Sequence, residues 1–318
     1  MTAFDVVCVG SSVVDIPLQP VDRSVFDAVS YPVNDISMRA GGDALNESIV
    51  LSRLGAKVAL VTAVGADAAG DFIVESARSE AVDVGGIRVN ERLTTSLNVG
   101  LVQPDGERTF ITNRNGSLWK TEESDIDAAN HLDGRILAFG SIFNNPLLSG
   151  EWLAGLFAQA RRAGMTVCAD MVPSRIGAGL EDIAEALSYV DYFFPNAQEA
   201  VALTGARDES EAADILLGKG VGTVVLKVGK RGCLVRGNEV DAVVPAFVRD
   251  DLEAIDTTGA GDNFAAGFIR ALLDGKSAQE CAVFANAVAA VSVGGLGATE
   301  GVRSKAQVDE FIASNKRK

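Results

Sequence analysis

The most informative stretch of this sequence is Asp256-Thr257-Thr258-Gly259-Ala260-Gly261-Asp262-Asn263-Phe264, which leads into a helical pattern over 262–274. Glycines at the start of a helix let bare backbone N–H groups approach a ligand, and the helix dipole favours an anion there. The amides of Gly259, Ala260 and Gly261 are therefore candidates for an anion hole. Asp262 would repel a resting anion, so we interpret it as a general base that accepts the proton of an attacking hydroxyl group. The alternative is an ordinary first-turn Asp that caps the helix and complements its dipole.

Before this stretch, short β-branched runs alternate with helical patterns. The expected strands are 6–10, 57–65, 136–140, 166–170, 192–195 and 223–229. The expected helices are 43–54, 68–81, 149–164, 179–188, 197–204 and 210–219, followed by 262–274, 277–292 and 305–314. Apolar strands separated by helices predict a doubly wound, mostly parallel α/β sheet flanked by helices.

Two segments, 13–40 and 94–113, break this alternation with polar and apolar residues in period two. Residues 96–101 and 108–111 resemble the arms of a hairpin around a turn at 104–107. We expect a small β-sheet that caps the carboxyl ends of the parallel strands, where ligands bind in such folds. The chain is thus expected to be a single α/β domain over 1–318, with this lid sheet inserted from about 13–40 and 94–113.

Composition narrows the possible partners. The 318 residues carry 28 Lys plus Arg against 43 Asp plus Glu, a formal charge of −15, which argues against a nucleic acid ligand.

The apolar segment 281–298 contains Asn286, Ser292 and three glycines, so we predict a buried helix running into a loop rather than a membrane span. The first residues lack the basic region of a signal peptide, and a cytoplasmic protein is expected. The four cysteines are widely spaced, which predicts small core residues and neither disulfides nor structural zinc.

Three motifs together indicate a family. The patterns GxxxxGK[ST] and GxGxxG at a strand-to-helix junction are absent, which removes the common NTPase and dinucleotide loops. Residues 256–269 resemble the second signature of the ribokinase/pfkB carbohydrate kinases, and residues 41–48 (GGDALNES) resemble the first. Residues 196–199 (NAQE) match the NxxE motif of the same family. The three motifs occur in the family's order and span nearly the whole chain, so the resemblance implies a ribokinase-like fold.

On the nucleotide side, the resemblance implies that Asp262 is the catalytic base and that Asn196 lies near the phosphates of ATP. Glu199 would help to place Mg²⁺ through water, which suits an ion that keeps several waters; its alternative is a solvated first-turn residue. The segment with Lys227, Gly229 and Gly232 would lie beside ATP, and Asn286 near the adenine. The alternative for Asn286 is a polar residue satisfied inside a helix pair.

On the sugar side, the resemblance implies that Asp15 accepts hydrogen bonds from substrate hydroxyls, together with Gly41, Gly42 and Asn46. The alternative for Asp15 is a turn residue at the base of the lid. In many members the lid closes over the sugar and also forms the interface of a homodimer. Two residues, Asp256 and Thr258, match the loop that holds a monovalent cation, K⁺, in ribokinases, whose other ligands would be backbone carbonyls near Ser292, Gly295 and Gly297.

Some residues depart from the ribokinase pattern. Asp43 and Glu47 are acidic where ribokinases tend to have Lys and Gln, which puts ribose in doubt as the substrate. Arg39 and Arg114 lie in or next to the expected lid and are candidates to meet an anionic substrate such as a sugar acid, although surface arginines are common. The only histidine, His131, supports no catalytic triad.

The leading hypothesis is an ATP-dependent kinase that phosphorylates a primary hydroxyl of a sugar or sugar derivative. A nucleoside kinase of the same fold is the first alternative, and the scarcity of aromatic residues over 10–46 disfavours it. A sugar- or nucleotide-binding protein without turnover is the second, and it would have no use for a carboxylate that faces the γ-phosphate.

Overall fold

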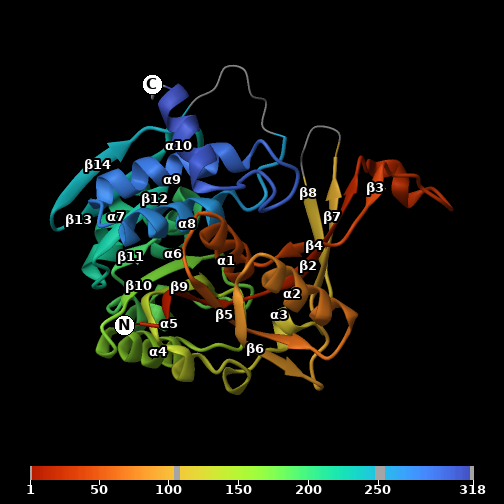
Figure 1. The fold of residues 1–318 in the computed structure, drawn as a ribbon, viewed down its shortest axis with the longest axis horizontal. Helices are drawn as coiled ribbons and strands as arrows, with labels where there is room; N and C mark the ends of the chain where they lie inside the picture. The colour runs from red at the N-terminus through yellow and green to blue at the C-terminus, as the bar shows by residue number, and fades with distance from the viewer. Residues whose placement is uncertain (1, 104–107, 248–254, 316–318) are drawn as a thin grey trace.

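The computed structural model describes residues 2–103, 108–247 and 255–315, with a large sheet, helices on both of its faces and a smaller sheet at one side (Figure 1). Within these residues the large sheet has the strand order β14-β13-β12-β11-β10-β9-β1-β5-β6. The bounds are β1 (Phe4–Gly10), β5 (Val58–Gly65), β6 (Asp83–Asn90), β9 (Gly134–Ile142), β10 (Thr166–Met171), β11 (Tyr192–Phe193), β12 (Thr223–Lys227), β13 (Cys233–Gly237) and β14 (Val240–Val244). Pairing is parallel from β6 to β12 and antiparallel for β13 and β14. The prediction of a doubly wound, mostly parallel sheet is confirmed.

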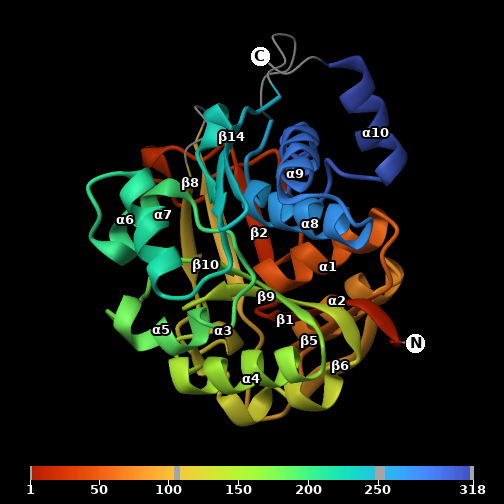
Figure 2. The same cartoon turned by 90° about the vertical axis from the view of Figure 1, so that its left-hand side faces the viewer.

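Helices cover both faces of this sheet, and Figure 2 shows α1, α8 and α9 on one face and α4 and α5 on the other. The bounds are α1 (Asp43–Arg53), α2 (Ala68–Ser79), α3 (Ser117–Lys120), α4 (Gly150–Arg162), α5 (Leu180–Leu187), α6 (Ala197–Thr204), α7 (Glu209–Gly218), α8 (Ala260–Leu273), α9 (Ala278–Ser292) and α10 (Lys305–Ser314). In β1, which lies between β9 and β5, Val6 and Cys8 face the first layer while Val7 and Val9 face the second. Successive side chains of a strand point to opposite faces, so a strand covered on both sides needs the continuous apolar run that the sequence has.

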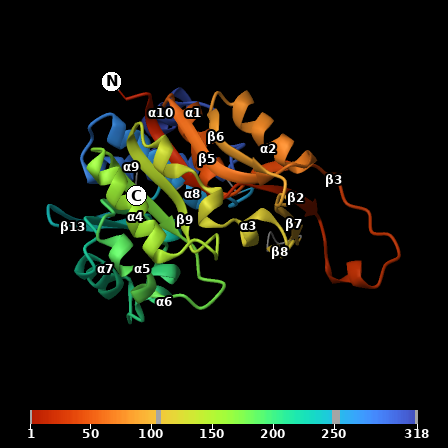
Figure 3. The same ribbon diagram turned by 90° about the horizontal axis from the view of Figure 1, so that it is seen from below.

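The smaller sheet is built from the two segments that broke the alternation. It consists of β2 (Val13–Gln19), β3 (Asp35–Ile36), β4 (Arg39–Gly41), β7 (Leu97–Val102) and β8 (Arg108–Thr112). β2 pairs with β7 in parallel, and β7 pairs with β8 in antiparallel fashion, as the hairpin pattern predicts. The predicted turn at 104–107 lies outside the described residues. Figure 3 shows that this sheet and the chain around β3 extend away from the rest of the molecule.

Two further expectations concern the core. Cys8, Cys168, Cys233 and Cys281 are all free and buried, as expected for small core residues. The apolar segment 281–298 forms most of α9, which ends at Ser292 and is followed by a loop. Among the residues that the structure describes, no helix has both the length and the apolar character needed to cross a bilayer.

Candidate active site

The candidate site lies where the carboxyl ends of the central strands meet the first turns of α1 and α8. A Cβ atom at Gly140, in β9, would lie 2.6 Å from the backbone nitrogen of Ala44, so α1 starts directly above this strand. A Cβ atom at Gly261, in α8, would lie 3.2 Å from the ammonium nitrogen of Lys227 at the end of β12. Ligands of open α/β sheets bind at this edge, so the motifs of the sequence meet at the expected place.

The candidate anion hole has a distinct backbone geometry. Gly259 is the N-cap of α8 and has φ +70°, in the left-handed region that glycine adopts without strain. A Cβ atom there would lie 2.7 Å from the carbonyl oxygen of Ala298. The side-chain amide of Asn263 donates to both the Gly259 and the Ala298 carbonyl oxygens, at 2.7 Å each. Asn263 is fully buried and holds the cap in place, a role that the sequence analysis did not assign.

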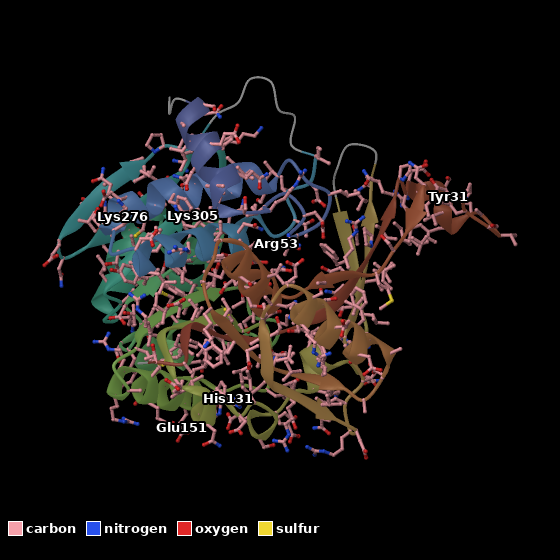
Figure 4. The ribbon with its side chains drawn as sticks, in the orientation of Figure 1. Tyr31, Arg53, His131, Glu151, Lys276 and Lys305 are labelled. Atoms are coloured by element: carbon pink, nitrogen blue, oxygen red, sulfur yellow. The ribbon has the colours of Figure 1, made fainter. Side chains whose placement is uncertain are left out.

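Arg53 supports the same loop from the end of α1. Its guanidinium donates to the carbonyl oxygen of Thr299 and, at 3.0 Å, to that of Val302, and it pairs with Glu80. Figure 4 labels Arg53 at this junction of α1 with the loop after α9. The loop that backs the anion hole is therefore fixed from two sides. His131, also labelled in Figure 4, ends η3 (Ala128–His131), which packs on α4 on the other face of the sheet.

Asp262 lies in the first turn of α8, next to the anion hole. Its Oδ2 accepts a hydrogen bond of 2.7 Å from the side-chain amide of Asn46 in α1. Burial, followed by the negative charge of Asp43, raises the pKa of Asp262 well above its ordinary value, while the bond from Asn46 acts to lower it. A carboxylate with a raised pKa is a stronger base, which suits proton transfer from a hydroxyl group. The other amide atom of Asn46, Oδ1, is buried and has no partner, so it is available to a ligand.

Lys227 is the cation of the site. Its ammonium group forms an ion pair of 2.5 Å with Oδ2 of Asp170 at the end of β10; the Asp170 side chain is buried and that of Lys227 is 15% exposed. Burial acts to lower the pKa of Lys227, but the carboxylates of Asp170 and Glu199 outweigh it and the pKa is raised, so the ammonium stays charged. Asp170 was not among the sequence candidates. The signal that could have found it is an Asp at the end of a predicted parallel strand.

Two further carboxyl groups of α1 surround the base. Asp43 accepts a hydrogen bond of 3.0 Å from the side chain of Asn144, and Glu47 is 2% exposed. Burial raises the pKa of both groups, and in Glu47 the negative charges of Asp262, Asp170 and Asp43 add to this effect. The departure from the ribokinase pattern at these two positions therefore places two further carboxyl groups at the candidate site, and burial disfavours the ionised form of both.

The structure groups the predicted sugar-binding residues around the base of the small sheet. Asp15, in β2, accepts a hydrogen bond of 3.0 Å from Asn98, and burial raises its pKa to about 6. A Cβ atom at Gly41 would collide with the Asp15 carboxylate, and one at Gly42 (φ +90°) would lie 2.7 Å from the Ser11 carbonyl oxygen. Only glycine lets the backbone at Gly41 and Gly42 come this close to Asp15 and Ser11. A cavity of about 60 Å³ lies between Asp15 and the loops around Asp256 and Gly297.

On the nucleotide side, Asn196 caps α6 and forms a capping box with Glu199. The Asn196 Oδ1 accepts from the Glu199 amide at 2.9 Å, and the Glu199 Oε2 accepts from the Asn196 amide at 2.7 Å. The backbone of Asn196 bridges to that of Lys227, which places this motif beside the ion pair. Gly229 and Gly232 both have positive φ, +61° and +99°, at the turn between β12 and β13.

Asn286 is 6% exposed and donates to the carbonyl oxygens of Val244 (3.1 Å) and Pro245 (3.3 Å) at the end of β14. These contacts join α9 to the sheet edge. A role for Asn286 beside the adenine stays a prediction.

The two segments that resemble the monovalent-cation loop of ribokinases lie next to each other in the structure. Asp256 accepts from the amides of Thr258 (2.8 Å) and Gly297 (2.9 Å), and the amide of Ile255 donates to the Val293 carbonyl oxygen (2.9 Å). The two halves of the candidate K⁺ loop are therefore adjacent, as the resemblance implies.

The donors available to Mg²⁺ are all oxygens. Within the described residues no group of three or more His, Cys, Asp and Glu side chains is arranged to hold a metal ion. Glu199 and Asp170 lie around Lys227 and supply carboxylate oxygens. Mg²⁺ prefers oxygen ligands, keeps several waters and uses one or two carboxylates with substrate phosphates, so this donor set fits it.

Comparison with known proteins agrees with this geometry. A family model described as pfkB family carbohydrate kinase matches residues 3–305. A ribokinase from Haemophilus influenzae is 30% identical over 281 residues (86% of this chain, 87% of the relative). A 2-dehydro-3-deoxygluconokinase from Bacillus subtilis is 27% identical over 299 residues, 90% of each chain.

Solved structures give the same result. The crystal structure of a ribokinase from Thermotoga maritima superposes with a TM-score of 0.82 at 26% identity and covers 98% of this chain and 99% of that one. An Escherichia coli structure with ATP and Mg²⁺ superposes with a TM-score of 0.83 at 21% identity, over 98% and 99% of the two chains. The fold and the matches define a phosphotransferase of the sugar-kinase type. The chain belongs to the pfkB family of carbohydrate kinases.

Proposed function

We propose that this kinase transfers the γ-phosphoryl group of ATP to a primary hydroxyl of a sugar or sugar derivative, with Asp262 as the general base. One observation carries the proposal: a half-buried carboxylate stands beside the backbone amides of a helix start and accepts a hydrogen bond from Asn46. A resting anion site gains nothing from such a carboxylate, whereas an attacking hydroxyl needs a proton acceptor at this position.

In this proposal each part of the site has one task. Asp15, Gly41, Gly42 and Asn46 bind and orient the acceptor hydroxyls, and Asp262 accepts the proton of the attacking one. The amides of Gly259, Ala260 and Gly261 stabilise the negative charge that develops on the phosphoryl oxygens.

On the opposite side, Asn196, Lys227, Gly229, Gly232 and Asn286 contact the nucleotide. Mg²⁺, placed through water by Glu199, supplies further charge neutralisation when it is bound. The Asp256 and Thr258 loop binds K⁺.

The small sheet acts as the lid of a single catalytic domain and as the interface of a homodimer in the cytoplasm. Support for the interface comes from apolar side chains exposed on and around this sheet. They are Phe26, Val29, Ile36, Met38, Phe110 and Ile111, from 44% to 107% exposed. Figure 4 labels Tyr31 at the outer end of the same segment. Sedimentation that shows only the 33.1 kDa monomer would contradict the dimer.

The experiment is a measurement of ADP release by the purified protein with ribose, fructose, 2-keto-3-deoxygluconate and adenosine as acceptors, repeated with Asp262→Asn. We expect turnover with at least one sugar and a fall in kcat of about 10² to 10⁴ in the variant, with a modest change in KM. The matched control is Asp71→Asn, which changes the exposed first-turn Asp of α2 and should leave kcat unaltered. Near-normal turnover by Asp262→Asn would refute the assignment, and a preference for adenosine would favour a nucleoside kinase.

A further inference from the structure

The loop between α9 and α10, residues 293–304, consists of turns and bends, and side chains from four other elements hold its backbone. The carbonyl oxygens that accept from these side chains are those of Leu296 (from Arg39 in β4), Ala298 (from Asn263 in α8), Thr299 and Val302 (both from Arg53 in α1) and Gly301 (from Gln307 in α10). A backbone carbonyl group away from water needs a hydrogen-bond partner, and an irregular loop lacks the regular partners of a helix or strand. Residues outside the loop therefore determine its shape.

Two of these residues are arginines at the two ends of one segment, 39–53. Arg39 lies in β4, and Arg53 is the last residue of α1, where Figure 4 labels it. Between them lies Asn46, whose amide binds the carboxylate of Asp262. One segment thus contacts the candidate base with its middle and the loop after α9 with both of its ends.

Arg39 holds the first part of the loop. Its Nη1 donates to the carbonyl oxygen of Leu296 at 2.6 Å, and a Cβ atom at Gly297 would lie 3.1 Å from the same nitrogen. The backbone amide of Gly297 in turn donates to the Asp256 carboxylate at 2.9 Å. Asp256 precedes Gly259, the N-cap of α8, by three residues. A shift of the loop at Arg39 therefore reaches the anion hole through a single side-chain contact.

Arg53 holds the second part of the loop. Its Nη1 donates to the carbonyl oxygens of Thr299 and Val302, while Nε and Nη2 donate to the two carboxylate oxygens of Glu80 at 2.9 Å and 2.6 Å. The side chain is 17% exposed, so water does not readily replace these bonds. Thr299 directly follows the residue whose carbonyl oxygen shares a side-chain amide with that of Gly259. The guanidinium of Arg53 thus acts one residue away from the support of the helix start.

We propose that Arg39 and Arg53 are positioning residues for phosphoryl transfer: by holding the loop after α9, this arginine pair fixes the backbone amides of the anion hole at 259–261. The inference rests on the proposed function, because the anion hole is part of it. Donors that are already in place stabilise developing charge without reorganisation, and a displacement of about 1 Å can lower a rate about 10²-fold. The hole acts on charge that develops in the transition state, so loss of the arginine pair should lower kcat more than it changes the KM for the acceptor.

The test compares Gln and Lys replacements of the two arginines with two control variants. Arg39 makes one bond to the loop, which an ammonium group can also make, whereas Arg53 uses three nitrogen atoms for the loop and Glu80 together. Arg88→Gln is the matched control, because Arg88 in the edge strand β6 donates to the carbonyl oxygen of Ser124 at the same distance of 2.6 Å. Glu80→Gln is the stability control, because it breaks the ion pair of Arg53 and leaves both of its bonds to the loop.

Kinetics of ADP release give kcat and KM, and urea unfolding gives the stability of each variant. We expect Arg39→Gln to lower kcat about 3- to 10-fold and Arg53→Gln about 10- to 100-fold, with the KM for the acceptor changed less than about threefold. Arg39→Lys should recover most of the lost kcat, and Arg53→Lys little of it. Arg88→Gln should keep the wild-type kcat. Glu80→Gln should lower the midpoint of urea unfolding and keep kcat within about threefold of the wild type.

Hydrogen exchange followed by mass spectrometry tests the loop without the reaction. In the protein without substrates, peptides covering 256–265 and 293–302 should exchange at least about fivefold faster in Arg39→Gln and Arg53→Gln than in the wild type. Peptides from α4, on the other face of the sheet, should be unchanged, because the expected loosening is local. Arg88→Gln should leave all of these peptides unchanged.

Three results would overturn the inference: a kcat of Arg53→Gln within about threefold of the wild type, a KM for the acceptor that rises as much as kcat falls, or an equal loss of kcat in Glu80→Gln, which would make stability the cause. If Arg53→Gln does not fold, Arg39→Gln decides, and a wild-type kcat with unchanged exchange in that variant removes the role of the arginine pair. Turnover of a sugar with no effect of either arginine variant keeps the kinase and removes this inference. Faster exchange of both peptides without ADP from any acceptor keeps the hold on the loop and removes the proposed reaction.

Discussion

The hydrogen bond from Asn46 to Asp262 allows a quantitative test of the general base. The bond measures 2.7 Å and Asn46 is 4% exposed, so water does not replace the amide freely when it is removed. A hydrogen bond to a charged group contributes about 1.5–3 kcal/mol, which corresponds to a loss of about 10- to 150-fold in kcat for Asn46→Ala at neutral pH. The N–H group stabilises the ionised carboxylate, so its loss raises the pKa of Asp262 further. The deficit should therefore shrink as the pH rises and the base ionises.

The assay is kcat at saturating acceptor and ATP from pH 5 to about pH 9.5. The acid limb of the Asn46→Ala profile should move to higher pH, and the two profiles should converge on the alkaline side. Asn98→Ala is the matched control, because Asn98 makes the same kind of bond, 3.0 Å long, to Asp15. It should raise the KM for the acceptor and leave the kcat profile in place. A deficit in Asn46→Ala that is equal at every pH would refute the reasoning.

Three further outcomes are expected. Gly259→Ala forces a side chain into the left-handed region and within 2.7 Å of Ala298, so urea unfolding should show a loss of at least about 1–2 kcal/mol, together with a loss of kcat. Lys227→Met leaves the Asp170 carboxylate buried without a cation, so the free energy of unfolding in urea should fall by about 3–5 kcal/mol. The double variant Lys227→Met/Asp170→Leu should recover the stability but not the activity. The pKa of Asp15 is raised to about 6, so its carboxylate is ionised above that pH, and the KM for the acceptor should rise as the pH falls through it; a constant KM would contradict its role.

The large sheet could be predicted from the sequence where its strands are buried on both faces. β1, β5, β9 and β10 are continuous apolar runs, and each was expected within two residues of its observed bounds. β6 was missed because it contains two glycines and has several exposed side chains; a Cβ atom at Gly86 would lie 2.8 Å from the Leu60 carbonyl oxygen. β13 and β14 were missed because each is only five residues long and carries a charged residue, Arg236 or Asp241, and because their burial depends on contact with α9.

The sequence could predict which motifs belong to the candidate site, but not which side chains contact one another there. The sequence indicates Asp262 and its glycines because they are contiguous and precede a helix. It does not indicate which partners they meet, since Asn46 and Asp262 are 216 residues apart and their contact depends on how α1 packs against α8. The ion pair of Lys227 with Asp170 depends in the same way on two neighbouring strands. Asn263 was missed because a buried amide inside a helix has no sequence signature of its own.

The packing of α1 on α8 also has a consequence for how the chain folds during its synthesis. Leu45 and Ile49 of α1 share one core with Phe264 and Phe268 of α8, and these helices are separated by most of the chain. During synthesis on the ribosome, α1 can pack on β1 and β5 early, but the part of its surface that α8 covers stays exposed while some two hundred further residues are added. Contacts between residues so far apart in the sequence form late and slow the folding of the domain. The nascent chain is therefore expected to depend on a holding chaperone, and catalytic competence should arrive only when α8 docks.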